Sequence, residues 1–134
     1  MNREFHGVRA WAIKIIAISF TIFQLYTAGF GFLPDMQQRA VHVAFGLTLT
    51  FALIPPVRSA KPNKKIPVYD LILIGVGIVG CANAFFKYEI FLLEYGLVTT
   101  EDFIIGTCLT VLILEAGRRT TGWAFPGLTL FLLI

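Results

Sequence analysis

The chain has 134 residues, of which 57% are hydrophobic and 14% are charged. Soluble domains average about 45–50% apolar and about 25% charged residues, so this chain has too few charges to cover a surface that faces water. The formal net charge is +3, but the basic residues are scattered between apolar runs and form no basic face for a phosphate backbone. The composition argues against a soluble enzyme and a nucleic-acid-binding protein. It predicts an all-α integral membrane protein.

The first apolar run, Trp11 to Leu33, is long enough to cross a bilayer. Its 23 residues reach about 34 Å as a helix, against a hydrocarbon core of about 30 Å. The charged residues before it give the order of a signal peptide, but the run is too long for one and lacks a clear A-x-A site. Lys14 lies near its N-terminal end, where the ammonium can reach the headgroups. We expect an uncleaved first membrane helix.

A second membrane helix is predicted for residues 37–54. Proline cannot continue a helix, so Pro34 ends the first run and Pro55 ends the second, and Asp35 can cap the helix between them. The following residues 57–67 carry four basic side chains and no acidic one. They are expected to form a solvated loop that faces the cytoplasm.

A third membrane helix is predicted to run from Asp70, as its N-cap, to Phe86. Its middle is rich in small residues, and pairs of small residues four positions apart let a second helix approach closely in a membrane. The pairs expected to pack in this way are Gly77 with Cys81 and Gly80 with Ala84. Cys81 and Cys108 stand in no metal-binding pattern and are expected to be packing residues.

The last third of the chain is predicted to hold a fourth helix and the start of a fifth. Residues 87–100 mix acidic and large apolar side chains, which is typical of a segment along the membrane surface. Thr99 and Asp102 have the spacing of a capping box, and the helix that they open is expected to cover residues 102–116. Its charge-free part is short for a membrane span. A fifth helix is expected to begin at Trp123.

The distribution of charge predicts a topology with both ends in the cytoplasm. With four crossings, nine of the eleven basic residues fall on the side of the N-terminus, the 57–67 loop and the segment after Glu115. Only Arg39 and Lys87 fall on the other side, together with five acidic residues. Cytoplasmic loops carry an excess of lysine and arginine. We therefore expect four transmembrane helices, with the N- and C-terminal ends inside.

Residues 75–80, GVGIVG, match the glycine spacing of a dinucleotide-binding fingerprint. In that fingerprint the glycines follow a strand and let the backbone approach a pyrophosphate, and an acidic residue about 20 positions later binds the ribose. Glu94 stands at about that distance. A dinucleotide-dependent membrane oxidoreductase is therefore an alternative function. It needs further strand–helix units that this composition does not supply, so helix packing is the favoured interpretation.

Two sets of polar residues are candidates for a functional role. His42 follows Arg39 by about one helical turn, and a membrane histidine can couple proton movement, although a hydrogen bond to a neighbouring helix is the commoner role. Glu115 precedes Arg118 and Arg119 by three and four residues, so the three are expected to form an ion-pair cluster at a helix end. The sequence has no Ser-His-Asp arrangement, so neither enzyme activity nor a cofactor is expected.

The segment from Leu114 to Pro126, LEAGRRTTGWAFP, resembles a signature of the fused permease subunits of TAXI-type TRAP (tripartite ATP-independent periplasmic) transporters. The positions that match are Glu115, Arg118, Arg119, Gly122, Trp123 and Pro126. Arg39 with His42, and Asp70 after Pro67, are also similar to those proteins. Gly117 departs from the pattern, because that family usually has threonine there.

The resemblance implies a scaffold role for this chain. In that family a four-helix part, which resembles the small Q-type subunit, precedes a much larger M-type part that holds the substrate and coupling-ion sites. Residues 1–122 correspond to the small part and residues 123–134 to the start of a connecting helix. The implied partners are the M-type permease part, a periplasmic solute-binding protein and the lipid bilayer of a bacterial inner membrane. A small membrane assembly protein without a transport role is a further alternative.

Overall fold

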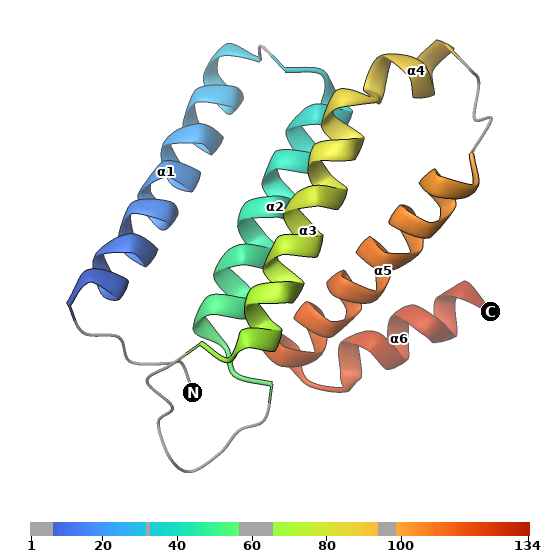
Figure 1. Ribbon diagram of the computed structural model, residues 1–134. Coiled ribbons are helices and arrows are strands. Elements are labelled where there is room, and N and C mark those ends of the chain that lie inside the picture. Colours follow the sequence, from blue (N-terminus) through green and yellow to red (C-terminus); the bar gives the residue numbers. More distant parts are fainter. Residues whose placement is uncertain (1–6, 32, 57–65, 94–98) are drawn as a thin grey trace.

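The computed structural model describes residues 7–31, 33–56, 66–93 and 99–134. These residues are 87% helical and contain no strand, so the all-α prediction is confirmed. The helices are α1 (Val8–Phe30), α2 (Asp35–Leu53), α3 (Val68–Phe86), α4 (Tyr88–Leu93), α5 (Thr100–Thr121) and α6 (Ala124–Leu133) (Figure 1).

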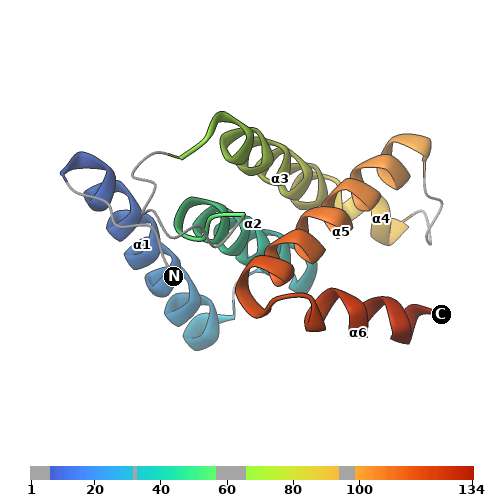
Figure 2. The same ribbon diagram turned by 90° about the horizontal axis from the view of Figure 1, so that it is seen from below.

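The four long helices α1, α2, α3 and α5 stand side by side, and successive helices run in opposite directions (Figure 1). We call the end at which α1 begins and α5 ends the proximal end, and the opposite end, at which α2 begins, the distal end. Seen from the proximal end, α2 lies between α1 and the other long helices (Figure 2). This arrangement brings the end of α2, the start of α3 and the end of α5 together.

The boundaries of α3 correct one prediction. Pro67 takes the N-cap position, and no side chain caps the helix. Proline suits this position because its ring fixes φ. Proline has no backbone N–H, but N–H groups at the start of a helix have no partner within the helix, so no hydrogen bond is lost. Asp70 therefore stands inside the first turn of α3, where it is fully buried. The prediction that it caps the helix is wrong. Asp35 likewise does not cap α2: it is the first residue of that helix, Pro34 takes the N-cap position, and no side chain caps the helix.

The boundaries of α5 show why that helix is longer than predicted. The Thr99 side chain accepts from the backbone N–H of Asp102, and the Asp102 carboxylate accepts from the backbone N–H of Thr99. The predicted capping box is thus confirmed. The helix then continues to Thr121, because Gly122, with φ of 85°, is the first residue whose backbone leaves the helical region. Its length is 22 residues.

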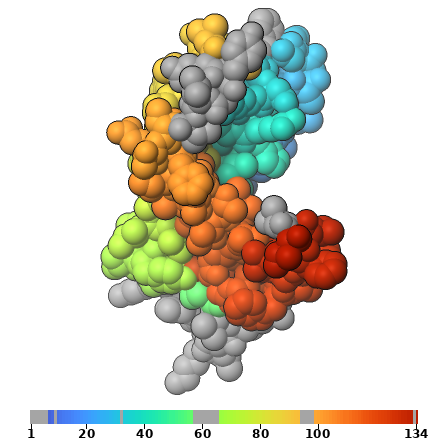
Figure 3. All heavy atoms as spheres, turned by 90° about the vertical axis from the view of Figure 1, so that its right-hand side faces the viewer, coloured from blue at the N-terminus to red at the C-terminus, as the bar shows by residue number. Residues whose placement is uncertain are grey.

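The buried core is mostly apolar, but it also contains charged side chains, and many large apolar side chains are exposed. Phe51 and Asp70 are the largest fully buried side chains among the described residues, and Arg119 is also buried. Large apolar side chains are exposed along α1 in contrast, and they include Trp11, Ile15, Ile18, Ile22 and Leu25. Figure 3 shows the face on which the surfaces of α5 and α6 lie next to each other, and exposed apolar side chains of these two helices include Phe103, Val111, Leu128 and Phe131. Extensive exposed apolar surface is a mark of contact with a membrane or a partner.

Two described helices are long and apolar enough to cross a membrane by length and composition: residues Ala10–Phe30 of α1, and α3. This finding supports association with a membrane. α2 and α5 are not among them, because both carry more polar and charged side chains. The described part of the chain therefore holds two candidate spans, not the four expected from the sequence.

Candidate functional site

The side chain of Arg119, in the last turn of α5, joins three helices at the proximal end. Its Nη1 donates to Oδ1 of Asp70 on α3 at 2.9 Å and to the carbonyl oxygen of Ile54, which follows α2, at 3.2 Å. Its Nε donates to Oε1 of Glu115 at 2.8 Å, and its Nη2 donates to the hydroxyl of Tyr69. Neither the Arg119 nor the Asp70 side chain has exposed surface.

Aromatic rings complete the surroundings of the Arg119 guanidinium. Its central carbon lies 4.8 Å from the ring centroid of Phe51 and 5.4 Å from that of Tyr69. A delocalised guanidinium can stack on rings while its N–H groups donate in its own plane, which an ammonium cannot do. The site is therefore matched to arginine and not to positive charge alone.

Arg118 makes a second, more exposed set of contacts. It forms a two-pronged ion pair with Glu115, with both N···O distances at 2.7 Å. Its Nη2 also donates to the carbonyl oxygen of Pro56 at 3.3 Å, and its guanidinium lies 5.4 Å from the ring centroid of Trp123. Arg118 thus connects the end of α5 to the segment after α2 and to the start of α6.

We call Asp70, Glu115, Arg118 and Arg119 the Arg119 cluster. Its formal charges cancel, with two carboxylates and two guanidinium groups. Burying a charge is costly unless it is paired and hydrogen-bonded, and each described polar group here has such partners. The predicted contacts of Glu115 with both arginines are present, and the contact of Arg119 with Asp70 is an addition that the sequence analysis missed.

A signal for that missed contact was present in the sequence. The predicted topology puts the start of the third helix and the end of the fourth helix on the same side of the membrane. A lone carboxylate at one of these ends and an arginine pair at the other are therefore expected to lie close together. The interpretation of Asp70 as a cap predicts no contact with Arg119, because a capping carboxylate accepts its hydrogen bonds from the backbone of its own helix.

The junction between α5 and α6 is shaped by glycine. A Cβ at Gly117 would overlap the ring of Phe125, so α6 packs directly on the backbone of α5 at this point. Gly122 has a positive φ of 85°, which side-chain-bearing residues rarely adopt. Trp123 is 76% exposed beside this turn, whereas Pro126 is buried in the first turn of α6.

The glycines of residues 75–80 lie in the middle of α3 and not at the start of a helix. Backbone N–H groups in a helix interior already donate within the helix, so they cannot cradle a pyrophosphate. A Cβ at Gly77 would lie 3.2 Å from Cδ1 of Leu47 on α2, and one at Gly80 would lie 2.9 Å from Cγ of Leu109 on α5. Cys81 is buried beside them and Ala84 is half-buried. Gly77 and Gly80 thus occur where neighbouring helices approach α3, whereas a Cβ at Gly75 would meet nothing within 4 Å.

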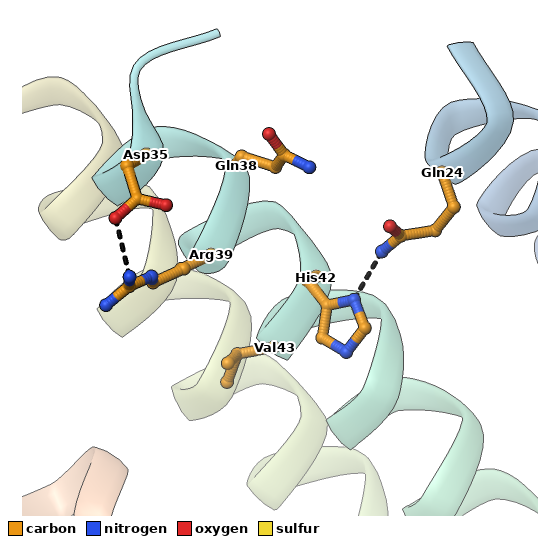
Figure 4. Close-up of a pocket in the computed structure, with 6 residues that line it drawn as sticks. All are labelled: Gln24, Asp35, Gln38, Arg39, His42 and Val43. Atoms are coloured by element: carbon orange, nitrogen blue, oxygen red, sulfur yellow. Dashed lines mark hydrogen bonds and ion pairs between the residues drawn. The ribbon is translucent and has the colours of Figure 1, made fainter. Parts of the chain in front are cut away.

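A second group of predicted residues lines a pocket of about 330 Å³ at the distal end (Figure 4). Arg39 Nη2 lies 2.6 Å from Oδ2 of Asp35, and both side chains are 77% exposed. The amide nitrogen of Gln24, on α1, forms a hydrogen bond with Nδ1 of His42. The remaining lining residues are Gln38 and Val43. His42 and Arg39 are therefore not part of the Arg119 cluster, and His42 joins α1 to α2.

A further ion pair closes the distal end of the bundle. Lys87 Nζ, just after α3, lies 3.0 Å from Oδ1 of Asp102 at the start of α5. The hydrogen bond from the Thr99 hydroxyl, and next to it the one from Lys87, hold the pKa of Asp102 below its ordinary value. Among the described residues no three His, Cys, Asp or Glu side chains are grouped so that they could hold a metal ion.

No family model matches this chain, and searches of curated proteins and of solved structures find no match either.

Proposed function

We propose that the chain is the small scaffold part of a TAXI-type TRAP transporter permease, which takes up solutes by means of an ion gradient and a periplasmic binding protein. The observation that carries the proposal is the Arg119 cluster. The charged residues of the signature-like segment Leu114–Pro126 tie α2, α3 and α5 together and leave Trp123 exposed at the start of α6. These are the features expected of a segment that fixes a scaffold and presents a contact to the part that follows.

The proposal requires α2 and α5 to cross the membrane together with α1 and α3. With 19 and 22 residues, they are about 28 and 33 Å long, close to a hydrocarbon core of about 30 Å. The greater observed length of α5 supports its crossing. Charged residues at its C-terminal end are compatible with a membrane because protein groups surround and pair them.

The positions of the helix ends support a topology with both chain ends in the cytoplasm of a bacterial cell. Arg118 and Arg119 stand at the proximal end, whereas Asp35, Glu89 and Glu101 stand at the distal end. By the positive-inside rule the proximal end faces the cytoplasm. Single cysteines at Thr100 and Thr121, in a background with Cys81→Ala and Cys108→Ser, test this directly. An impermeant thiol reagent added to intact cells should label position 100 only; labelling of position 121 contradicts the topology.

The scaffold role follows from what the described helices offer. Transport sites usually lie near the bilayer midplane and are framed by broken helices. In the described ranges α1, α2, α3 and α5 are each continuous, and their charged side chains lie towards their ends. The M-type part would accordingly hold the substrate and coupling-ion sites, and this chain would anchor that part and widen the transporter in the membrane.

The three functions can be distinguished by identifying the molecules that are purified together with the chain. The mid-helix position of residues 75–80 gives the oxidoreductase no phosphate-binding loop. An assembly protein without a transport role would be purified without a permease. The proposed scaffold, tagged and purified from native membranes, should be recovered with an M-type permease part, either as a separate polypeptide or as a continuation of the same one.

A pair of matched variants makes this experiment specific. Trp123→Ala should lower recovery of the intact assembly about fivefold, because a well-placed interface tryptophan contributes strongly to binding. Trp11→Ala is the control, since Trp11 is also exposed, at 68%, and lies at the same end on α1. Arg119→Glu should also lower assembly. Equal recovery for all variants, or a permease-free chain, contradicts the proposal.

A further inference from the structure

The distal pocket combines opposite charges, neutral donors and an apolar floor in one small space. Figure 4 shows Asp35 and Arg39 at one side of the pocket and Gln24 and His42 at the other. We propose that it binds the headgroup of a phospholipid that carries both a phosphodiester and a primary ammonium, such as phosphatidylethanolamine. This inference requires α1 and α2 to stand in a membrane, but it does not depend on the transporter assignment.

The depth of the pocket fits this ligand. Asp35 is the first residue of α2, and His42 is seven residues further along the helix, which is about 10 Å at 1.5 Å per residue. The interfacial region on each side of a bilayer is about 5–8 Å thick. Asp35 stands at the start of the membrane-spanning length of α2, so the pocket opens at the boundary between the headgroups and the hydrocarbon core.

The charges of the pocket are complementary to a zwitterion. The Arg39 guanidinium has five N–H donors in a fork that matches phosphate oxygens, and the structure uses one of its terminal nitrogens for Asp35. The second carboxylate oxygen of Asp35 can accept from a primary ammonium. A purely anionic headgroup would meet repulsion from Asp35, and a quaternary ammonium has no N–H to donate.

Neutral groups supply further donors deeper in the pocket. Nδ1 of His42 is engaged in the hydrogen bond with the amide of Gln24, so Nε2 is the second polar atom that the ring offers. The amide of Gln38 donates to the Thr27 hydroxyl at 3.3 Å and has a second N–H. An ester carbonyl oxygen can accept a hydrogen bond from the second N–H of Gln38, and Val43 offers an apolar contact.

The test uses the full chain in detergent and measures lipid binding by native mass spectrometry, together with the thermal unfolding midpoint. Phosphatidylethanolamine should bind about fivefold more tightly than phosphatidylglycerol and phosphatidylcholine of the same acyl chains, a ratio suited to exposed charge contacts. Inorganic phosphate and free phosphoethanolamine are the soluble probes, and both should bind more weakly than phosphatidylethanolamine. Equal binding of the three lipids overturns the proposal, as does full competition by inorganic phosphate.

Two variants assign the effect to this pocket. Asp35→Asn should remove the preference for the ethanolamine lipid over phosphatidylglycerol, and Arg39→Gln should weaken the binding of all three lipids about fivefold. Both side chains are largely exposed, so the unfolding midpoint without lipid should stay unchanged. Glu101→Gln, at the same end on α5, is the control and should leave the preference intact. Unchanged lipid preference in Asp35→Asn contradicts the proposal.

Discussion

Arg119 and Asp70 are 49 residues apart in the sequence, yet Nη1 of Arg119 donates to Oδ1 of Asp70 at 2.9 Å and neither side chain has exposed surface. The contact fastens the last turn of α5 to the first turn of α3. Because water does not reach either group, each charge relies on the other and on the neighbouring hydrogen bonds. Loss of either side chain removes an ion pair from a site that water does not reach; without Asp70, Arg119 keeps the ion pair with Glu115.

Removing one partner of this pair should destabilise the fold strongly. We expect Arg119→Gln or Asp70→Asn to lower the free energy of unfolding by about 3 kcal/mol. Arg118→Gln is the matched control, because the Arg118–Glu115 pair is about one quarter exposed. Its loss should cost at most about 1 kcal/mol. Unfolding of the purified chain in mixed detergent micelles, followed by circular dichroism, measures all three.

The double variant Asp70→Asn/Arg119→Gln separates the pair from its surroundings. Since the second substitution removes the buried charge that has lost this ion pair, the free energy of unfolding of the double variant should fall by clearly less than the sum for the two single variants. Additive costs would contradict the description of Arg119 and Asp70 as a coupled buried pair.

Gly80 should tolerate no side chain, whereas Gly75 on the same helix should. A Cβ at Gly80 would lie 2.9 Å from Leu109, and one at Gly75 would meet nothing within 4 Å. Gly80→Leu should therefore loosen the packing of α3 on α5 by at least about 1 kcal/mol, and Gly75→Leu should have little effect. The oxidoreductase alternative predicts a different result, namely NAD or flavin that is purified with the native chain and lost in Gly80→Leu.

Gly117 should determine the direction in which α6 leaves the bundle. Threonine at this position would overlap the ring of Phe125 and push α6 away from α5. Spin labels at the exposed positions Val111 and Leu128 report the distance between the two helices. Gly117→Thr should change that distance, and Gly117→Thr/Phe125→Ala should restore it. Gly106→Thr, on an open part of α5, is the control. An unchanged distance in Gly117→Thr argues against this role of Gly117.

Asp102 gives the N-terminus of α5 a dependence on pH. The hydrogen bonds from Thr99 and Lys87 hold its pKa in the folded chain below the ordinary value of 3.8. A depressed carboxyl pKa adds stability above the unfolded pKa, and this stability is lost as the pH falls through the folded pKa. Hydrogen exchange at the first turn of α5 should accelerate below about pH 4 relative to Asp102→Asn. A rate ratio independent of pH would count against this assignment.

The sequence predicts the helices of this fold well because their limits are set locally. Pro55 and the Thr99–Asp102 pair act within one turn of the chain, so each can be recognised without knowledge of the neighbours, whereas α1 ends at Phe30, before the left-handed Gly31, and not at Pro34 as predicted. Asp70 could not be interpreted in this way. Its role depends on Arg119, which only the packing of α3 beside α5 brings into contact with it.

In the candidate sites, too, contacts within one helix could be predicted from the sequence, and contacts between helices could not. The contacts of Glu115 with Arg118 and Arg119 follow from helical spacing and were predictable. The overlap of Gly117 with Phe125 depends on the turn at Gly122, and the bond between His42 and Gln24 depends on the pairing of α1 with α2. Neither relationship leaves a mark in the spacing of residues along the chain.

The start of α6 is proposed to contact a permease part, and photo-crosslinking in native membranes tests this contact most directly. A photoreactive phenylalanine analogue replaces Trp123 in one variant and Trp11 in the other, both exposed tryptophans at the proximal end. After irradiation, digestion and mass spectrometry, position 123 should yield peptides joined to an M-type permease part, and position 11 should not. Cross-links from position 123 to lipid alone, or equal permease cross-links from both positions, would contradict the account.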